Sequence, residues 1–175
     1  MVSAGCVLAS LIAPPPAMAF SLSMTEACTL TVNSYAWYLD HPGNDPARRA
    51  EEFADLFTAG AILTRPNDAP ELETFKGRTA IAKSYLETTA FSRMIYLSSN
   101  IRIMPATDTT ATGTSYLTVY MHATSGSMKD AGAVTAIMEN RDEYEMTGDG
   151  CRISSRNSTL RMISTDGAIQ PPQAQ

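Results

Sequence analysis

Apolar residues in the first half of the chain recur every three to four positions, which is the spacing of amphipathic helices. The stripe of the first helix, expected over residues 24–39, consists of Ala27, Leu30, Ser34, Trp37 and Tyr38. Thr25 is the expected start of this helix, and the proline- and glycine-containing segment 41–44 ends it. Asp45 and Pro46 then supply the cap and first turn of a second helix that reaches Phe57.

A third helix is expected over residues 79–89, with Ile81, Tyr85 and Leu86 facing inward. Short strands are expected at 61–65 and 72–75, and four long strands at 94–104, 111–124, 133–146 and 151–163. Helices that come first and antiparallel strands that follow predict an α+β fold. Three N-terminal helices then pack on one face of a curved, mainly antiparallel sheet, with a conical cavity between the two layers.

The two ends of the chain carry signals of another kind. Residues 1–19 form an apolar segment that closes on Ala17-Met18-Ala19, which predicts a signal peptide cleaved before Phe20. A disordered N-terminal tail is the alternative, because no Lys or Arg precedes the apolar run. The domain then spans 20–164, and the Pro- and Gln-rich segment 165–175 is expected to be a disordered tail. A cleaved signal predicts a periplasmic or secreted protein.

Charge and cysteine content exclude several function classes. The net charge is −5 and no basic stripe is present, which argues against nucleic-acid binding. No run reaches the length of a membrane span, so no membrane insertion is expected after signal removal. Signal cleavage leaves Cys28 and Cys151, which form either a long-range disulfide or two buried thiols. The spacing of Cys and His matches no metal site.

The two strands 94–104 and 111–124 gather polar side chains on one face if they form a hairpin. With Tyr96 near Thr118 and Asn100 near Thr114, residues of equal parity share a face. The polar face then holds Tyr96, Ser98, Asn100, Thr114, Tyr116, Tyr120 and His122, and the apolar face holds Ile95, Leu97, Ile101, Ile103, Leu117, Val119 and Met121. Either the polar face meets a ligand and the apolar face a second subunit, as in a homo-oligomer, or the polar face meets solvent and the apolar face is the core.

Six short motifs are spread along the chain in a fixed order. They are Tyr35-x-x-x-Leu39-Asp40, Phe53-Ala54-Asp55-Leu56-Phe57, Phe75-Lys76-Gly77-Arg78-x-Ala80-Ile81, Tyr96-x-x-x-Asn100, Gly113-x-x-Tyr116 and Gly150-Cys151-Arg152-Ile153-x-x-Arg156. Together they resemble the SnoaL-like branch of the NTF2-like superfamily over residues 24–163. That branch includes scytalone dehydratase, hexachlorocyclohexane dehydrochlorinase and polyketide cyclases. The resemblance implies an NTF2-like cone and no metal or organic cofactor.

The resemblance also implies a site. In the dehydratase and dehydrochlorinase relatives, an Asp at a helix end and a His on the first long strand together remove a proton from the substrate. Asp40 stands at the first of these positions, but Tyr96 stands at the second, so the dyad is absent. A phenol has a pKa near ~10, against ~6.5 for imidazole. Tyr96 is therefore expected to donate a proton or orient a substrate oxygen rather than act as a base.

The other candidates have weaker assignments. Substrate-binding roles are assigned to Tyr35, Arg65, Asn100, Tyr116 and Tyr120. His122 either completes a catalytic relay or is a surface histidine, and His41 is expected to cap its helix. Trp37 is expected in the core, and Arg156 is expected to pair with Glu139 or Glu143.

Three functions remain open at this point. The leading hypothesis is a lyase of the dehydratase, isomerase or cyclase type, which acts on a hydroxylated aromatic or polycyclic apolar molecule with a buried Asp40 as base. The alternative is a non-catalytic module that binds a hydrophobic ligand. Epoxide hydrolysis is the third, with Asp40 and Arg65 around a water, but it needs a second acid. Asp142 does not qualify, because its parity places it with Tyr144 and away from Glu139 and Glu143.

Overall fold

The computed structural model describes residues 22–66, 71–88, 94–122, 133–165 and 168–170. The predicted signal peptide lies outside these residues. The helices are α1 (Met24–Asp40), α2 (Pro46–Ala54) and α3 (Arg78–Thr88). The strands are β1 (Phe57–Pro66), β2 (Leu72–Lys76), β3 (Met94–Pro105), β4 (Thr110–His122), β5 (Ala133–Thr147), β6 (Gly150–Thr165) and β7 (Ala168–Gln170). The last of these lies in the segment predicted as a disordered tail.

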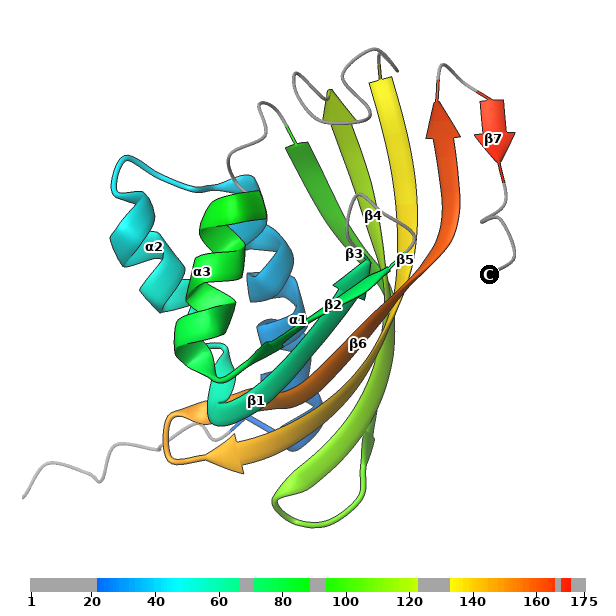
Figure 1. The fold of residues 1–175 in the computed structure, drawn as a ribbon. Coiled ribbons are helices and arrows are strands. Elements are labelled where there is room, and N and C mark those ends of the chain that lie inside the picture. The colour runs from blue at the N-terminus through cyan, green and yellow to red at the C-terminus, as the bar shows by residue number, and fades with distance from the viewer. Residues whose placement is uncertain (1–21, 67–70, 89–93, 123–132, 166–167, 171–175) are drawn as a thin grey trace, which may run out of the picture.

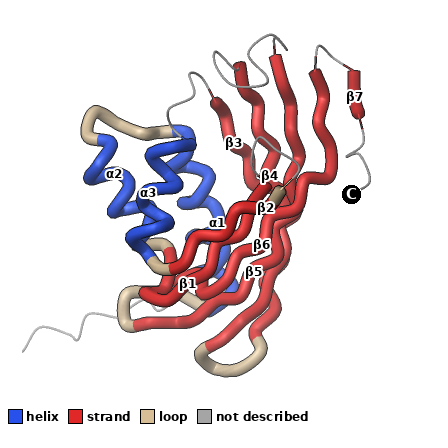
Figure 2. The backbone as a smooth tube through the Cα atoms, viewed as in Figure 1, coloured by secondary structure: helices blue, strands red, loops and turns tan. Residues whose placement is uncertain are grey.

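All three helices lie on one side of a single sheet, which bends around them (Figures 1 and 2). The strand order is β2-β1-β6-β5-β4-β3, and β7 pairs with the far end of β6. Only the β1–β6 pair is parallel among the described strands. Helix α1 packs on β3 and β6, while α2 and α3 pack on each other. The predicted α+β arrangement is therefore confirmed.

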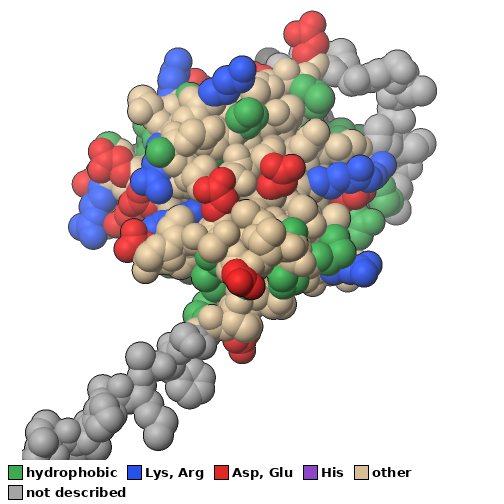
Figure 3. Space-filling view, turned by 90° about the horizontal axis from the view of Figure 1, so that it is seen from below, with side chains coloured by type: hydrophobic (Ala, Val, Ile, Leu, Met, Phe, Trp, Pro, Cys, Tyr) green, Lys and Arg blue, Asp and Glu red, His purple; other side chains and the backbone are tan. Residues whose placement is uncertain are grey.

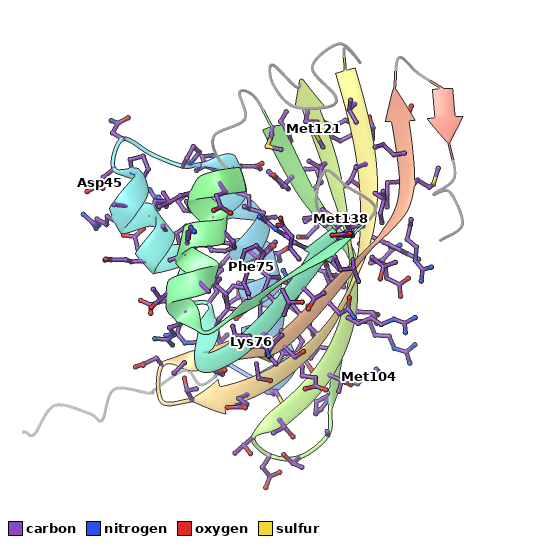
Figure 4. All side chains as sticks on the ribbon, viewed as in Figure 1. Asp45, Phe75, Lys76, Met104, Met121 and Met138 are labelled. Atoms are coloured by element: carbon purple, nitrogen blue, oxygen red, sulfur yellow. A yellow bond between two sulfur atoms is a disulfide. The ribbon has the colours of Figure 1, made fainter. Side chains whose placement is uncertain are left out.

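The helix starts follow from capping side chains. Helix α1 begins at Met24 as predicted, but Ser23 and not Thr25 is its cap: the Ser23 hydroxyl and the Glu26 carboxylate form a reciprocal capping box. Asp45 caps α2 and Pro46 occupies its first turn, as predicted (Asp45 is labelled in Figure 4). Helix α2 ends earlier than predicted, because Phe57 already begins β1.

The buried stripe of α1 differs from the predicted one. It consists of Ala27, Cys28, Thr31, Val32, Tyr35, Ala36 and Leu39. Leu30 and Trp37 are 53% and 46% exposed, so the expectation that Trp37 lies in the core is wrong. Its indole stacks on His41 and lies 5.1 Å from the Arg49 guanidinium instead. His41 does cap the helix, because its backbone N–H donates to the carbonyl of Trp37. Leu86 of α3 is also exposed, whereas Ile81 and Tyr85 face inward as predicted.

A disulfide joins α1 to β6. Cys28 and Cys151 are bonded with an S–S distance of 2.07 Å, which decides between the two alternatives left open by the sequence. Both residues are buried. The hydroxyl of Thr31 donates to the Cys151 carbonyl at 2.8 Å, which adds a second link at the same place.

The hairpin of β3 and β4 contains a β-bulge that the sequence did not reveal. Next to the turn Arg102 pairs with Thr114, but beyond the bulge Ser99 pairs with Tyr116. Two β3 residues, Asn100 and Ile101, therefore face one residue of β4, and Asn100 has a φ of 49°. Tyr96 lies opposite Val119 rather than near Thr118. The predicted register is wrong by one residue, and a shift of one residue moves side chains to the other face.

The outer face of the sheet shows the consequence. Tyr116 and Tyr120 are 37% and 46% exposed there, beside the exposed side chains of Ile95 and Leu97. Leu117 and Val119 point into the core instead. For β4 the apolar face is therefore the core and the polar face meets solvent.

Charged side chains are interspersed on the surface. The face in Figure 3 carries acidic and basic groups side by side, with no continuous basic area. Among the helices that the structure describes, none is long and apolar enough to cross a membrane.

Candidate active site between the helices and the sheet

Asp40 is the last residue of α1 and is partly exposed, so the expectation that it is buried is wrong. Its Oδ1 accepts a hydrogen bond of 2.5 Å from the backbone N–H of Tyr96 in β3. A carboxylate is disfavoured at a helix C-terminus, and this N–H compensates for that position. The family resemblance implied that Asp40 and Tyr96 lie together, and they do, but the contact uses the backbone of Tyr96 and not its phenol.

The phenol of Tyr96 lies on the inner face and is 5% exposed. Its hydroxyl donates to the sulfur of Met94 at 3.2 Å. Burial, with smaller contributions from Tyr35 and Asp40, raises the pKa of Tyr96 above its ordinary range, although Arg65 opposes this. The hydroxyl therefore stays protonated at neutral pH, and Tyr96 is a hydrogen-bond donor rather than a base.

Two further predicted residues lie near this phenol. Tyr35 is buried, and its ring packs on Phe53 at a centroid distance of 5.0 Å. Arg65 of β1 is partly buried; its guanidinium lies 5.0 Å from the ring of Phe75 (labelled in Figure 4) and donates to the Ser84 carbonyl at 3.4 Å. Both influence the pKa of Tyr96 through space.

The remaining residues that were predicted to line the site do not lie beside the Tyr96 phenol in the described structure. Asn100 is exposed at the bulge, and Tyr116 and Tyr120 lie on the outer face of the sheet. The bulge is the physical reason, because it reverses the face of β3 relative to β4. His122 pairs with Ala133 at the end of β4, and its side chain lies outside the described part of the molecule.

A buried ion pair, which the sequence did not reveal, lies on the inner face. Arg156 donates from Nε to Asp142 Oδ1 at 2.8 Å and from Nη2 to Oδ2 at 2.7 Å, and both side chains are fully buried. The Tyr144 hydroxyl donates to the same Oδ2 at 2.7 Å. On the other side, the ring of Tyr35 lies 4.0 Å from the Arg156 guanidinium carbon. Gly113 leaves room for this arrangement, because a Cβ there would lie 2.9 Å from the Tyr144 ring.

The prediction that Arg156 pairs with Glu139 or Glu143 is wrong. Near the turn Tyr144 pairs with Ile153, but Ser154 is an extra residue and the register shifts, so that Asp142 faces Arg156. Glu139 instead binds Arg141 and Arg161 at the surface.

The ion pair leaves one donor unused. Burial alone lowers the pKa of Arg156, but the charge and hydrogen bonds of Asp142 outweigh it and raise the pKa, so the guanidinium stays charged. Its Nη1 is buried and has no hydrogen-bond partner among the described residues. Such groups are rare in folded proteins, which makes this atom a candidate to bind an oxygen of a ligand.

A second polar row lies beside the ion pair. Asn140 donates to the Ser115 hydroxyl at 3.3 Å and accepts from the Ser158 hydroxyl at 2.7 Å, and all three are buried. Because Asn140 and Asp142 are two residues apart on β5, the hydrogen bonds of Asn140 and the Asp142–Arg156 ion pair lie on the same face of the sheet, toward the helices. No cluster of three His, Cys, Asp or Glu side chains suited to a metal occurs within the described ranges.

Three buried tyrosines make the alkaline titration of the protein distinctive. Burial raises the pKa of Tyr85 to about 12, and it raises the pKa of Tyr96 and Tyr144 further. These groups contribute stability below the unfolded pKa near ~10, and that stability is lost as the pH rises through the folded pKa. We therefore expect three of the seven tyrosines, namely Tyr85, Tyr96 and Tyr144, to ionise at a higher pH in the native protein than in the denatured chain. The phenolate absorbance of the native protein should rise correspondingly later as the pH is increased. Tyr85→Phe should remove the contribution of one tyrosine from this late rise in absorbance. A native titration curve that matches the denatured one would contradict the burial of these rings.

The family model described as a SnoaL-like domain matches residues 21–157. The chain belongs to the SnoaL-like family. No curated protein matches it by sequence.

Solved structures resemble this SnoaL-like protein in fold. One, from Novosphingobium aromaticivorans and assigned as a scytalone dehydratase, has a TM-score of 0.64 and 20% identity over 86% of this chain and 93% of that one. A hexachlorocyclohexane dehydrochlorinase, LinA type 2, has a TM-score of 0.61 and 14% identity over 86% and 98%. An NTF2-like protein from Novosphingobium aromaticivorans has a TM-score of 0.58 and 20% identity over 83% and 84%. The NTF2-like fold expected from the sequence motifs is confirmed.

Proposed function

We propose that this SnoaL-like protein is a cofactor-independent lyase of the dehydratase, isomerase or cyclase type, acting on a hydroxylated aromatic or polycyclic apolar molecule. One observation carries the proposal: Asp40 is bound to the backbone N–H of Tyr96, so the carboxylate and the phenol do not bind each other. Oδ2 of Asp40 accepts no hydrogen bond from the described residues. The carboxylate as base and the phenol as proton donor are therefore not engaged with each other, and each can act on a third molecule.

The proposed chemistry uses each group once. Asp40 takes a proton from a carbon of the substrate, and the electron pair left behind forms a double bond or an enolate. In the elimination, Tyr96 protonates the departing hydroxyl, which leaves as water. In the isomerisation or cyclisation, Tyr96 instead donates a hydrogen bond to the enolate oxygen. In the elimination, the Tyr96 phenolate then regains a proton as Asp40 loses its own, by way of solvent. In the isomerisation or cyclisation, the proton on Asp40 returns to the substrate, at another carbon or at the new alkoxide oxygen, so that both groups are restored.

Arg156 supports the same chemistry from inside. It is a permanent cation in a water-poor environment, and its Nη1 is the unused donor. A cation fixed in a low dielectric stabilises developing negative charge more strongly than one in water. The named activities of two structural relatives, a dehydratase and a dehydrochlorinase, are both eliminations and agree with the proposal.

Asp40→Asn tests the role of the base. The expected result is a rate of product formation lower by about a hundredfold or more, because an amide cannot accept the proton. Purified wild type and variant would be incubated with a panel of hydroxylated aromatic and polycyclic compounds, with loss of water or isomerisation followed by mass spectrometry. Asp149→Asn is the matched control, because that carboxylate is 87% exposed. Equal rates in wild type and Asp40→Asn would refute Asp40 as the base.

The second candidate is a non-catalytic module for hydrophobic ligands. It is favoured by the absence of the dyad histidine, whose position is occupied by Tyr96. Recovery of the same unchanged ligand from wild type and from Asp40→Asn would support it against the lyase.

Epoxide hydrolysis needs a second acid that is free to act, and Asp142 is not free. Asp142 lies on the inner face with Tyr144 and away from Glu139 and Glu143, as parity predicted, but it is paired with Arg156 there. Both of its oxygens already accept hydrogen bonds, from Arg156 and from Tyr144.

A further inference from the structure

Met94 and Tyr96 are two positions apart on β3 and share the inner face of the sheet. Met94 is partly buried against the core, directly opposite Met121 of β4. Met121 is likewise partly buried and packed against the core. The Tyr96 hydroxyl is directed along β3 toward the Met94 sulfur, at 3.2 Å.

The choice of acceptor is unusual for a buried hydroxyl. A thioether sulfur is a weak hydrogen-bond acceptor, whereas a carboxylate is a strong one. Asp40 binds the backbone N–H of Tyr96, but the hydroxyl of Tyr96 is directed to the sulfur and not to this carboxylate. The hydroxyl is therefore kept in a defined direction without a strong bond, and little free energy is lost when it turns to another acceptor.

We propose that Met94 is a positioning residue, whose sulfur holds the Tyr96 hydroxyl in the ligand-free protein and releases it to a phenol or ketone oxygen of the ligand. The inference rests on the proposed function only for the chemical class of that ligand. A ligand oxygen is a better acceptor than sulfur, so the exchange favours binding. A ligand without oxygen at this place gains nothing from it, and Met94 thereby contributes to selectivity for oxygenated aromatic molecules.

Met94→Gln replaces the sulfur by a strong acceptor of similar length, and Met94→Leu removes the acceptor. With 2-naphthol and naphthalene as probes, Met94→Gln is expected to weaken 2-naphthol binding roughly two- to tenfold more than naphthalene binding, because a neutral hydrogen bond must now be broken. Met121→Gln is the matched control. It adds the same amide on the facing strand, where the Met121 side chain makes no hydrogen bond to any described residue, and it should affect both probes alike.

A second readout needs no ligand. The ring-carbon resonance of Tyr96 next to the hydroxyl, assigned by its loss in Tyr96→Phe, is expected to shift in Met94→Leu and in Met94→Gln but not in Met121→Gln. An unchanged resonance in Met94→Leu overturns the proposal, as does equal weakening of both probes by Met94→Gln. If neither probe binds the wild type, the assigned ligand class fails, while the resonance still decides whether Met94 holds the hydroxyl.

Discussion

Arg156→Met is expected to lower the free energy of unfolding by about 3–5 kcal/mol. The substitution leaves the Asp142 carboxylate fully buried with only the Tyr144 hydroxyl as a partner. A buried charge without its counterion carries a large desolvation cost, which the variant avoids only by unfolding or by taking up a proton. Urea unfolding at neutral pH, followed by circular dichroism, measures the loss.

Arg161→Met is the matched control for this prediction. Arg161 also binds a carboxylate on the neighbouring strand, Glu139, but its side chain is 47% exposed. An exposed pair contributes about 0–1 kcal/mol, so the same substitution should cost little there. Equal losses at the two positions would show that the Asp142–Arg156 pair is not the buried unit described above.

The double variant Arg156→Met with Asp142→Leu separates stability from function. Replacement of both charges by apolar side chains is expected to recover most of the lost free energy, since buried ion pairs are often no better than apolar packing. If stability returns but ligand binding or turnover does not, the ion pair and its unused Nη1 serve the site rather than the fold. That outcome is the one we expect.

Removal of the disulfide by Cys28→Ala with Cys151→Ala should cost about 2–5 kcal/mol. The bridge spans a sequence separation of 123 residues, and constraint of so long a loop in the unfolded chain corresponds to about 5 kcal/mol in the entropic account. The measurement is the same urea titration, with the wild type in the presence of a thiol reductant as the comparison. Each alanine fills its place with a small apolar group, so an added desolvation cost is not expected.

Two results would contradict this prediction: equal stability of the double variant and the wild type, or unchanged wild-type stability after reduction. The bridge also supports our proposal that the protein is exported, because such bonds persist in oxidising compartments. A mass that corresponds to the oxidised pair, in protein isolated from its own cells, is the result expected from that proposal.

The types and order of the long elements were predictable, because each has a clear periodicity and a capping or turn signal. Asp45 with Pro46 is an example, and so is the placement of Asp40 at a helix end. That Asp40 and Tyr96 lie together was anticipated through the family motifs, which also contain Tyr35, whereas Arg65 lies in none of them. The contact that joins Asp40 and Tyr96 was not anticipated, because a backbone N–H leaves no trace in a residue pattern.

What the sequence did not reveal has a common physical cause. Side chains alternate between the two faces of a sheet, so a residue's position predicts its face only while each residue of the strand pairs with one residue of its neighbour. The extra residues at Asn100 and Ser154 interrupt the pairing, and each reverses the faces beyond it. Tyr116 and Tyr120 were therefore assigned to the wrong side, and Arg156 to the wrong partner.

The bulge at Asn100 also has a consequence for the divergence of this family. Loss of one residue there would exchange the interior and exterior side chains of half of β3 in a single step, and so replace Tyr96 by a neighbour without any substitution. An insertion or deletion at this position would therefore change which side chains of β3 face the interior of the protein. When relatives are aligned, a gap set on the wrong side of Asn100 would match residues that face water with residues that face the helices. Comparisons of catalytic positions on this strand should be made from superposed backbones.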